Sequence, residues 1–145
     1  MTELNVDPNT LSRQDRYKLM CALVIPRPIA LVTTISKDGI VNAAPFSFFN
    51  VFSDKPSIVA LGVNSRPEGG MKDTSANIHY KKEFVVHMVT FEIAEQMNIS
   101  CVNFPPHISE IEEAGFTLRK SHILDTPSIA ESRVALECKL HSITR

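Results

Sequence analysis

The sequence predicts a mainly β fold with some α-helix (the α+β class), built as an antiparallel barrel with short peripheral helices. Two turn signals indicate this: Asp38-Gly39 separates two apolar runs, and Asp54-Lys55-Pro56 turns the chain again before a third. Glycine accepts the positive φ of a tight turn, and tight turns join antiparallel neighbours. No Gly-x-Gly-x-x-Gly motif follows a predicted strand, so a doubly wound dinucleotide-binding sheet is not predicted.

The first half of the chain predicts one helix followed by strands. Ser12 precedes Asp15 by three positions, and an acidic residue in the first turn suits a helix amino terminus. Pro26 and Pro28 end this helix, because proline lacks the N–H and restrains the residue before it. One face of the helix is expected to contain Leu11, Tyr17, Met20 and Leu23. Branched and aromatic residues predict strands over 29–35, 40–48 and 57–63.

The second half alternates strands with short helices. Asp73 or Thr74 is expected to cap a helix that runs to about Lys82, with Ile78 and Tyr80 flanking its buried side. Gly115 ends a short helix over 110–114, since glycine is favoured just past a helix end. The remaining elements are strands over 83–90 and 133–143 and a helix over 91–102.

Composition indicates a soluble single domain over residues 1–145. A chain of 145 residues buries about 68–70% of its unfolded surface, and its 43% hydrophobic and 21% charged residues are ordinary for a globular protein. A net charge of -1 with no basic stripe predicts no nucleic-acid partner. No signal peptide or membrane-length apolar run is present in the sequence. The three cysteines, Cys21, Cys101 and Cys138, have no ligand or disulfide spacing, so a cytoplasmic protein is expected.

The segment after the first hairpin combines small, hydroxyl, amide and aromatic residues, Asn42-Ala43-Ala44-Pro45-Phe46-Ser47-Phe48-Phe49-Asn50. Such a mixture suits a flat ligand with polar edges, although aromatic residues most often belong to the core. If Phe46 and Phe48 face the core, strand alternation turns Ser47 and Phe49 outward. An outward phenylalanine then needs a bound ring or a dimer partner to cover it.

Two later segments contain residues that suit phosphate binding. A solvated surface loop followed by a helix cap would have the same residue pattern. Arg66 offers a forked cation and Lys72 a point charge, beside the expected amino terminus of a helix with its free N–H groups. Asp73 is expected to cap that helix rather than to meet an anion.

Three segments together resemble the flavin reductase-like family: Ile25-Pro26-Arg27-Pro28-Ile29-Ala30, Pro45-Phe46-Ser47-Phe48-Phe49, and Lys72-Asp73-Thr74 with Asn77-Ile78. The resemblance implies an FMN-binding split β-barrel and a homodimer, because relatives place the flavin near the subunit interface. Family members continue with further strands beyond the last strand predicted here, so this chain is expected to lack the C-terminal strands of the family domain.

The resemblance also assigns cofactor-binding residues. Ser47 and Asn50 are expected to meet the flavin ring or ribityl chain, with Phe48 or Phe49 beside the ring. The implied phosphate-binding residues are Ser65, Arg66, Lys72 and Thr74. Contacts to the ring edge are expected from Thr33, Thr34 and Asn42.

No side chain is expected to take part in the hydride transfer, because the flavin N5 accepts the hydride. His107 is a candidate for meeting a nicotinamide over the flavin. The five histidines show no metal-ligand spacing, and neither a Ser-His-Asp nor a Gly-x-Ser-x-Gly pattern is found in the sequence.

The activity that the resemblance implies is reduction of flavin by NADH or NADPH, in the service of a partner monooxygenase. Two alternatives stay open: an FMN-containing electron carrier similar to flavoredoxin, and a flavin-free binding or dimerisation module that kept the fold.

Overall fold

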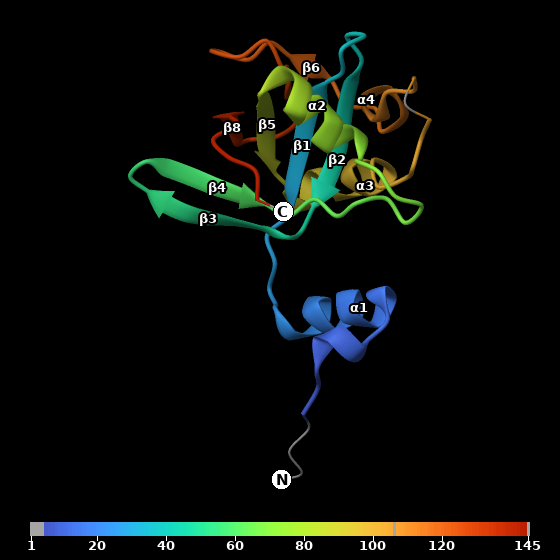
Figure 1. Ribbon diagram of the computed structural model, residues 1–145. Helices are drawn as coiled ribbons and strands as arrows, with labels where there is room; N and C mark the ends of the chain where they lie inside the picture. The colour runs from blue at the N-terminus through green and yellow to red at the C-terminus, as the bar shows by residue number, and fades with distance from the viewer. Residues whose placement is uncertain (1–4, 106, 145) are drawn as a thin grey trace.

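The computed structural model describes residues 5–105 and 107–144, and its centre is an antiparallel four-stranded sheet (Figure 1). The strand order is β2-β1-β5-β8, in which each neighbouring pair is antiparallel. The strands are β1 (Ala30–Ile35), β2 (Val41–Phe46), β5 (Glu83–Met88) and β8 (Ala135–Lys139). Gly39 takes a φ of 83° in the turn between β1 and β2, as the Asp-Gly signal predicts.

Two smaller antiparallel pairs accompany this sheet. The hairpin of β3 (Phe49–Asp54) and β4 (Ser57–Leu61) projects sideways from the body in Figure 1, and its turn is the predicted one at Lys55-Pro56. The other pair joins β6 (Leu118–Arg119) and β7 (Ser128–Ile129). The antiparallel α+β class that the sequence predicts is therefore confirmed.

The helices are short and peripheral. A 3-10 turn, η1 (Pro8–Thr10), precedes α1 (Arg13–Leu23), which contains no buried residue. The helix α2 (Asp73–Lys81) packs on β1, β2 and β5. Both α3 (Ala94–Ile99) and α4 (Glu110–Glu113) pack on β2, and the 3-10 turn η2 (Phe91–Ile93) leads into α3. None of the helices that the structure describes is long and apolar enough to cross a bilayer.

Two apolar clusters lie on the two faces of the main sheet, as the alternation along β1 requires. Ala30 and Val32 pack in one cluster with Ile78 of α2, whereas Leu31 packs in the other with Ile111 of α4. The sheet is therefore covered on both faces, which explains why all the residues of β1 except Ile35 are buried.

The strand predicted over 40–48 is interrupted, and this corrects the expected orientation of Phe49. β2 pairs with β1 and ends at Phe46, whereas β3 begins at Phe49 and pairs with β4. The change of partner breaks the alternation, so Phe46 and Phe49 both lie in the cluster that contains Ile78. Phe49 is only 8% exposed, and the prediction that it faces outward is wrong.

Three helix predictions also need correction. The helix expected over 91–102 is a 3-10 turn followed by six residues of α-helix. Tyr80 is 61% exposed and does not flank the buried side of α2, although Ile78 does. Leu23, expected on the apolar face of the first helix, is exposed because α1 lies away from the body (Figure 1).

Candidate functional site

The amino terminus of α2 is the centre of the candidate site. Lys72 occupies the N-cap position and makes no side-chain cap, so within the described residues no side chain caps the first N–H groups of this helix. Asp73 was expected to be the cap, but its carboxylate instead accepts two hydrogen bonds of 2.8 Å from Nη2 of Arg66. The Lys72 ammonium lies 5.8 Å from the centroid of the Phe46 ring. Helix dipole and cation together make this end of α2 electropositive.

The loop that precedes α2 is folded around Arg66. The Arg66 N–H donates to the Gly70 carbonyl at 3.2 Å, and its Nε donates to the Met71 carbonyl at 3.0 Å. The Arg66 guanidinium is thus held beside the helix terminus, while Ser65 stays exposed next to it. Serine, arginine, lysine and a helix amino terminus are the donors that phosphate oxygens accept from in proteins. The predicted phosphate-binding residues therefore share one region, and only the Thr74 side chain points elsewhere.

Thr74 belongs instead to a buried hydrogen-bond network beneath α2. Its hydroxyl donates to Oδ1 of Asn42 at 3.0 Å, and Thr34 donates to the same oxygen at 3.3 Å. Asn77 donates to Thr34 at 3.0 Å, and Nδ2 of Asn42 donates to Oε2 of Glu110 at 2.8 Å. These five side chains fix α2 and α4 to the sheet, so the polar groups of Thr34, Asn42 and Thr74 are engaged within the protein.

Glu110 closes this network at the edge strand β2. Its Oε2 also accepts from the backbone N–H of Ala43 at 3.2 Å, and Ser109 donates to the Val41 carbonyl at 2.5 Å. Both backbone groups are on the edge of β2 that no strand covers among the described residues. Burial raises the pKa of the Glu110 carboxyl, and the hydrogen bonds from its own N–H, Ala43 and Asn42 oppose that shift.

Ser47 and Phe48 form the link between β2 and β3, and residues from the N-terminal segment contact both. Nε of Arg27 donates to the Ser47 hydroxyl at 3.3 Å. The Phe48 ring packs at a tilt against Tyr17 of α1, with centroids 5.7 Å apart. Ser47 and Phe48 are both half-buried, so part of each side chain is exposed and can contact a ligand.

Gly62 passes so close to this link that it has no room for a side chain. Its N–H donates to the Phe48 carbonyl at 2.7 Å, and an added Cβ would lie 2.9 Å from Cβ of Phe48. We expect Gly62→Ala to displace Phe48 and to lower the free energy of unfolding by about 1–3 kcal/mol, the usual cost of overpacking. Urea unfolding measures this loss, with Gly70→Ala as a comparison in which a Cβ meets no neighbour but the φ of 88° remains costly. A Gly62→Ala protein as stable as wild type would show that the Ser47-Phe48 link can shift without a loss of stability.

The remaining predicted site residues are Thr33, Asn50 and His107. Thr33 is fully buried, and its hydroxyl donates to the Pro127 carbonyl at 2.7 Å. It faces away from Thr34, since successive residues of a strand point to opposite faces. Its side chain therefore cannot meet a ligand on the α2 side. Asn50 is exposed on β3, with its Oδ1 accepting from the Val51 N–H, and His107 is exposed in a turn before α4.

Several residues at the site were missed from sequence. The sequence indicates Arg27 only as part of a family motif, and it indicates no role at the site for Arg13, Tyr17, Gly62 and Glu110. The contacts of Arg13, Arg27 and Glu110 cross 52, 20 and 68 residues of sequence. No local pattern marks such partners. No group of three or more potential metal ligands occurs in the part of the chain that the structure describes.

Comparison with known proteins defines first the class and then the family. Solved structures of the same fold include one from Shewanella frigidimarina named for its split barrel domain, with a TM-score of 0.79 at 22% identity, so the fold is that of a split barrel. The profile of the flavin reductase like domain matches residues 22–145. The chain belongs to the flavin reductase-like family, which confirms the resemblance seen in its sequence. This membership supports a flavin cofactor and a flavin reductase-type function.

Individual relatives agree with this assignment. An uncharacterised protein of Halalkalibacterium halodurans is 46% identical over 140 residues, which are 97% of this chain and 67% of that protein. The structure of nitrilotriacetate monooxygenase component B from Bacillus cereus has a TM-score of 0.93 at 36% identity, covering 98% of this chain and 70% of that one. The structure of 2-nitrobenzoate 2-nitroreductase from Pseudomonas fluorescens has a TM-score of 0.86 at 38% identity, covering 97% of this chain and 67% of that one.

The chain is shorter than these relatives. It spans 67%, 64% and 63% of the lengths of three curated proteins that it matches.

Proposed function

We propose that this protein binds FMN and transfers hydride from NADH or NADPH to it, as an NAD(P)H:flavin oxidoreductase. The observation that supports FMN is the set of donors around the amino terminus of α2. Arg66, Lys72 and the uncapped first turn of the helix offer charge and N–H groups to one dianionic group. A flavin without the phosphate would place no anion beside the Lys72 ammonium and the first N–H groups of α2.

The residues present fit a flavin at the ring end as well. The half-buried Ser47 hydroxyl and the Phe48 ring lie on the β2–β3 link, so a hydrogen-bond donor and an aromatic surface occur side by side. When bound, a flavin would supply an acceptor for hydride, which is chemistry that no side chain provides. The residues of this chain would bind the flavin phosphate, orient the flavin ring and leave one face of that ring open to the nicotinamide. Holding reactants in register is worth up to about 7–11 kcal/mol in ideal cases.

The proposed partners follow from the similar proteins. The similarity to a monooxygenase component supports service to a separate monooxygenase, which would consume the reduced flavin. A homodimer and a cytoplasmic location remain part of the proposal. Light scattering coupled to gel filtration would test the dimer.

Flavin binding can be tested first and flavin reduction second. The visible spectrum of the purified protein, recorded after FMN loading and desalting, is expected to show a retained flavin band. Anaerobic mixing with NADH or NADPH is then expected to bleach that band. Retained flavin without bleaching would favour the electron carrier, and a protein that cannot be loaded would favour the flavin-free module.

A further inference from the structure

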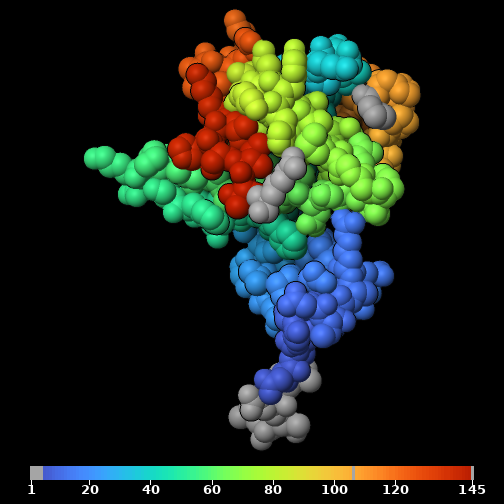
Figure 2. All heavy atoms as spheres, in the orientation of Figure 1, coloured from blue at the N-terminus to red at the C-terminus, as the bar shows by residue number. Residues whose placement is uncertain are grey.

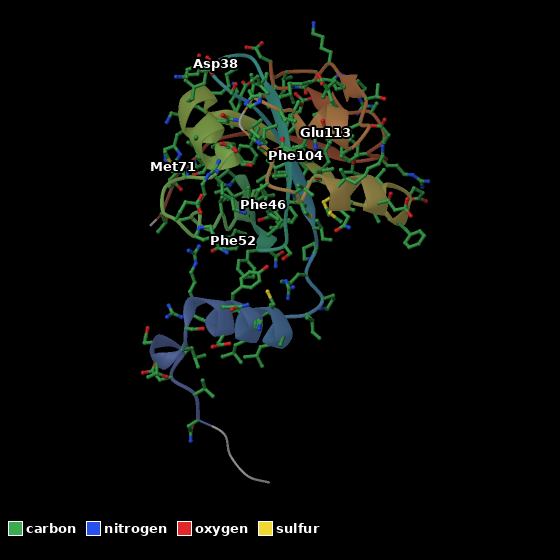
Figure 3. All side chains as sticks on the ribbon, turned by 90° about the vertical axis from the view of Figure 1, so that its right-hand side faces the viewer. Asp38, Phe46, Phe52, Met71, Phe104 and Glu113 are labelled. Carbon is green, nitrogen blue, oxygen red and sulfur yellow. The ribbon has the colours of Figure 1, made fainter. Side chains whose placement is uncertain are left out.

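The helix α1 is attached to the body by very few contacts. It has no buried residue, and the residues that follow it, Val24 and Ile25, are also exposed. In Figure 3 it lies as a separate layer beneath the body, on the side where Phe52 is labelled and away from Asp38. The space-filling view in Figure 2 shows α1 in blue below the other elements, with its atoms meeting the body along its upper side only. Its position must therefore depend on individual side chains.

These side chains all contact the predicted flavin site. Arg13 donates from Nη2 to the Ser65 carbonyl at 2.6 Å and from Nη1 to the Arg66 carbonyl at 3.4 Å. Tyr17 packs against Phe48, and Arg27 donates to Ser47. The two contacted segments, Ser47-Phe48 and Ser65-Arg66, come from different loops. The N-terminal segment thus connects the ring end of the predicted site to its phosphate end.

Arg27 determines how the Ser47 hydroxyl can be used. A hydroxyl has one proton to donate and two lone pairs, and a guanidinium can only donate. Because Ser47 accepts from Arg27, its own proton stays available for an acceptor on a ligand, such as a ring nitrogen or carbonyl. Nη1 of Arg27 is itself fixed by the carbonyls of Cys21 and Val24 at the end of α1. The orientation of Ser47 therefore depends on where α1 ends.

Arg13 acts on the other segment. Its guanidinium holds two consecutive carbonyls of the loop whose Arg66 side chain is already bound to Asp73. Both sides of the loop are then fixed, with the Ser65 hydroxyl and Lys72 beside it. Fixing a loop before the ligand arrives lowers the entropy that binding must remove.

We propose that Arg13, Tyr17 and Arg27 are positioning residues that couple the docking of α1 to flavin binding. This inference rests on the flavin-binding function proposed above. Docked α1 orients Ser47 and the 65–66 loop for the ligand, and bound flavin in turn holds α1 against the body. Such coupling is reciprocal, so each event strengthens the other by the same factor.

Affinities for two flavins separate the roles of the two arginines. We expect Arg13→Ala to weaken FMN binding by about tenfold and riboflavin by less than about twofold, because its loop belongs to the phosphate end. Arg27→Ala is expected to weaken both flavins by about tenfold, and Arg27→Lys to recover part of the loss. Fluorescence quenching of each flavin on titration with apoprotein gives these values. Lys18→Ala, an exposed change on α1, is the matched control and should bind both flavins like wild type.

A double-mutant cycle tests whether Arg27 acts through Ser47. If it does, Arg27→Ala in a Ser47→Ala background should weaken flavin binding by less than about twofold further. A purely structural role would instead give the full loss in both backgrounds. Additive losses in this cycle would overturn the assignment of Arg27.

Hydrogen exchange of the wild-type protein tests the coupling without any substitution. Addition of FMN is expected to slow amide exchange within Arg13–Leu23, although Arg13 and Arg27 need not touch the ligand. Wild-type flavin binding with unchanged α1 exchange and unaffected variants would overturn this inference alone. A wild-type protein that binds neither flavin would overturn the proposed function and this inference with it.

Discussion

Replacing Lys72 with alanine is expected to weaken FMN binding by about 1.5–3 kcal/mol and to leave riboflavin binding nearly unchanged. That loss is the usual worth of a hydrogen bond to a charged group. Lys72 sits at the N-cap of α2 and lies over the Phe46 ring, so its removal takes away charge without opening the core. Riboflavin lacks the phosphate and should not respond. Isothermal titration of the apoprotein with each flavin measures both affinities.

Arg66→Ala is expected to cost at least as much FMN affinity. The guanidinium neutralises Asp73, and without it a carboxylate would remain beside the phosphate. Lys55→Ala is a suitable control, since it removes the same charge at the β3–β4 turn, away from α2. Equal losses for FMN and riboflavin would refute the phosphate assignment, as would a Lys72→Ala protein with wild-type FMN affinity.

Local patterns predicted those parts of the fold whose determinants are close in sequence. The Asp38-Gly39 turn needs only the positive φ of Gly39, and the short helix before Gly115 needs only its end signal. Phe49 was misplaced because alternation holds only while a strand keeps one partner. The exchange of β1 for β4 as the partner at residues 47–48 depends on tertiary pairing, which a local window does not contain.

The candidate site shows the same division. Arg66 and Lys72 were predicted from residue type and from their place before a helix, and in the structure Arg66 binds Asp73, the residue that follows Lys72. Thr34 and Asn42 were predicted at the ring edge and Thr74 at the phosphate, yet Thr34 and Thr74 both donate to Asn42, whose own partner Glu110 lies 68 residues from it. That distance explains why ligand contacts were expected where the structure has a protein network. Side-chain chemistry alone does not reveal which polar groups the fold itself satisfies.

His87 is a buried titratable group that lies outside the candidate site. It is 0% exposed, with Nδ1 donating to the Leu31 carbonyl at 3.0 Å and Nε2 accepting from the Ile129 N–H at 2.9 Å. A second proton on Nε2 would face that N–H, so only the neutral tautomer fits. Burial lowers the pKa of His87 from 6.5 to about 4, and the positive charge of Arg119 adds to this, although the bond to Leu31 opposes it.

Acid is therefore expected to destabilise the protein through His87. Between pH 6.5 and about 4 the unfolded chain binds a proton at this residue that the folded chain does not. The stability from neutral His87 is complete above pH 6.5 and falls as the pH drops through that window, by about 3 kcal/mol in all. Urea unfolding at a series of pH values should show this slope in wild type and a flatter one in His87→Asn, whatever the stability of the variant at pH 7. NMR of the folded wild type gives an independent check: a His87 ring that titrates near 6.5 would mean that water reaches it, and the expected slope would then be absent.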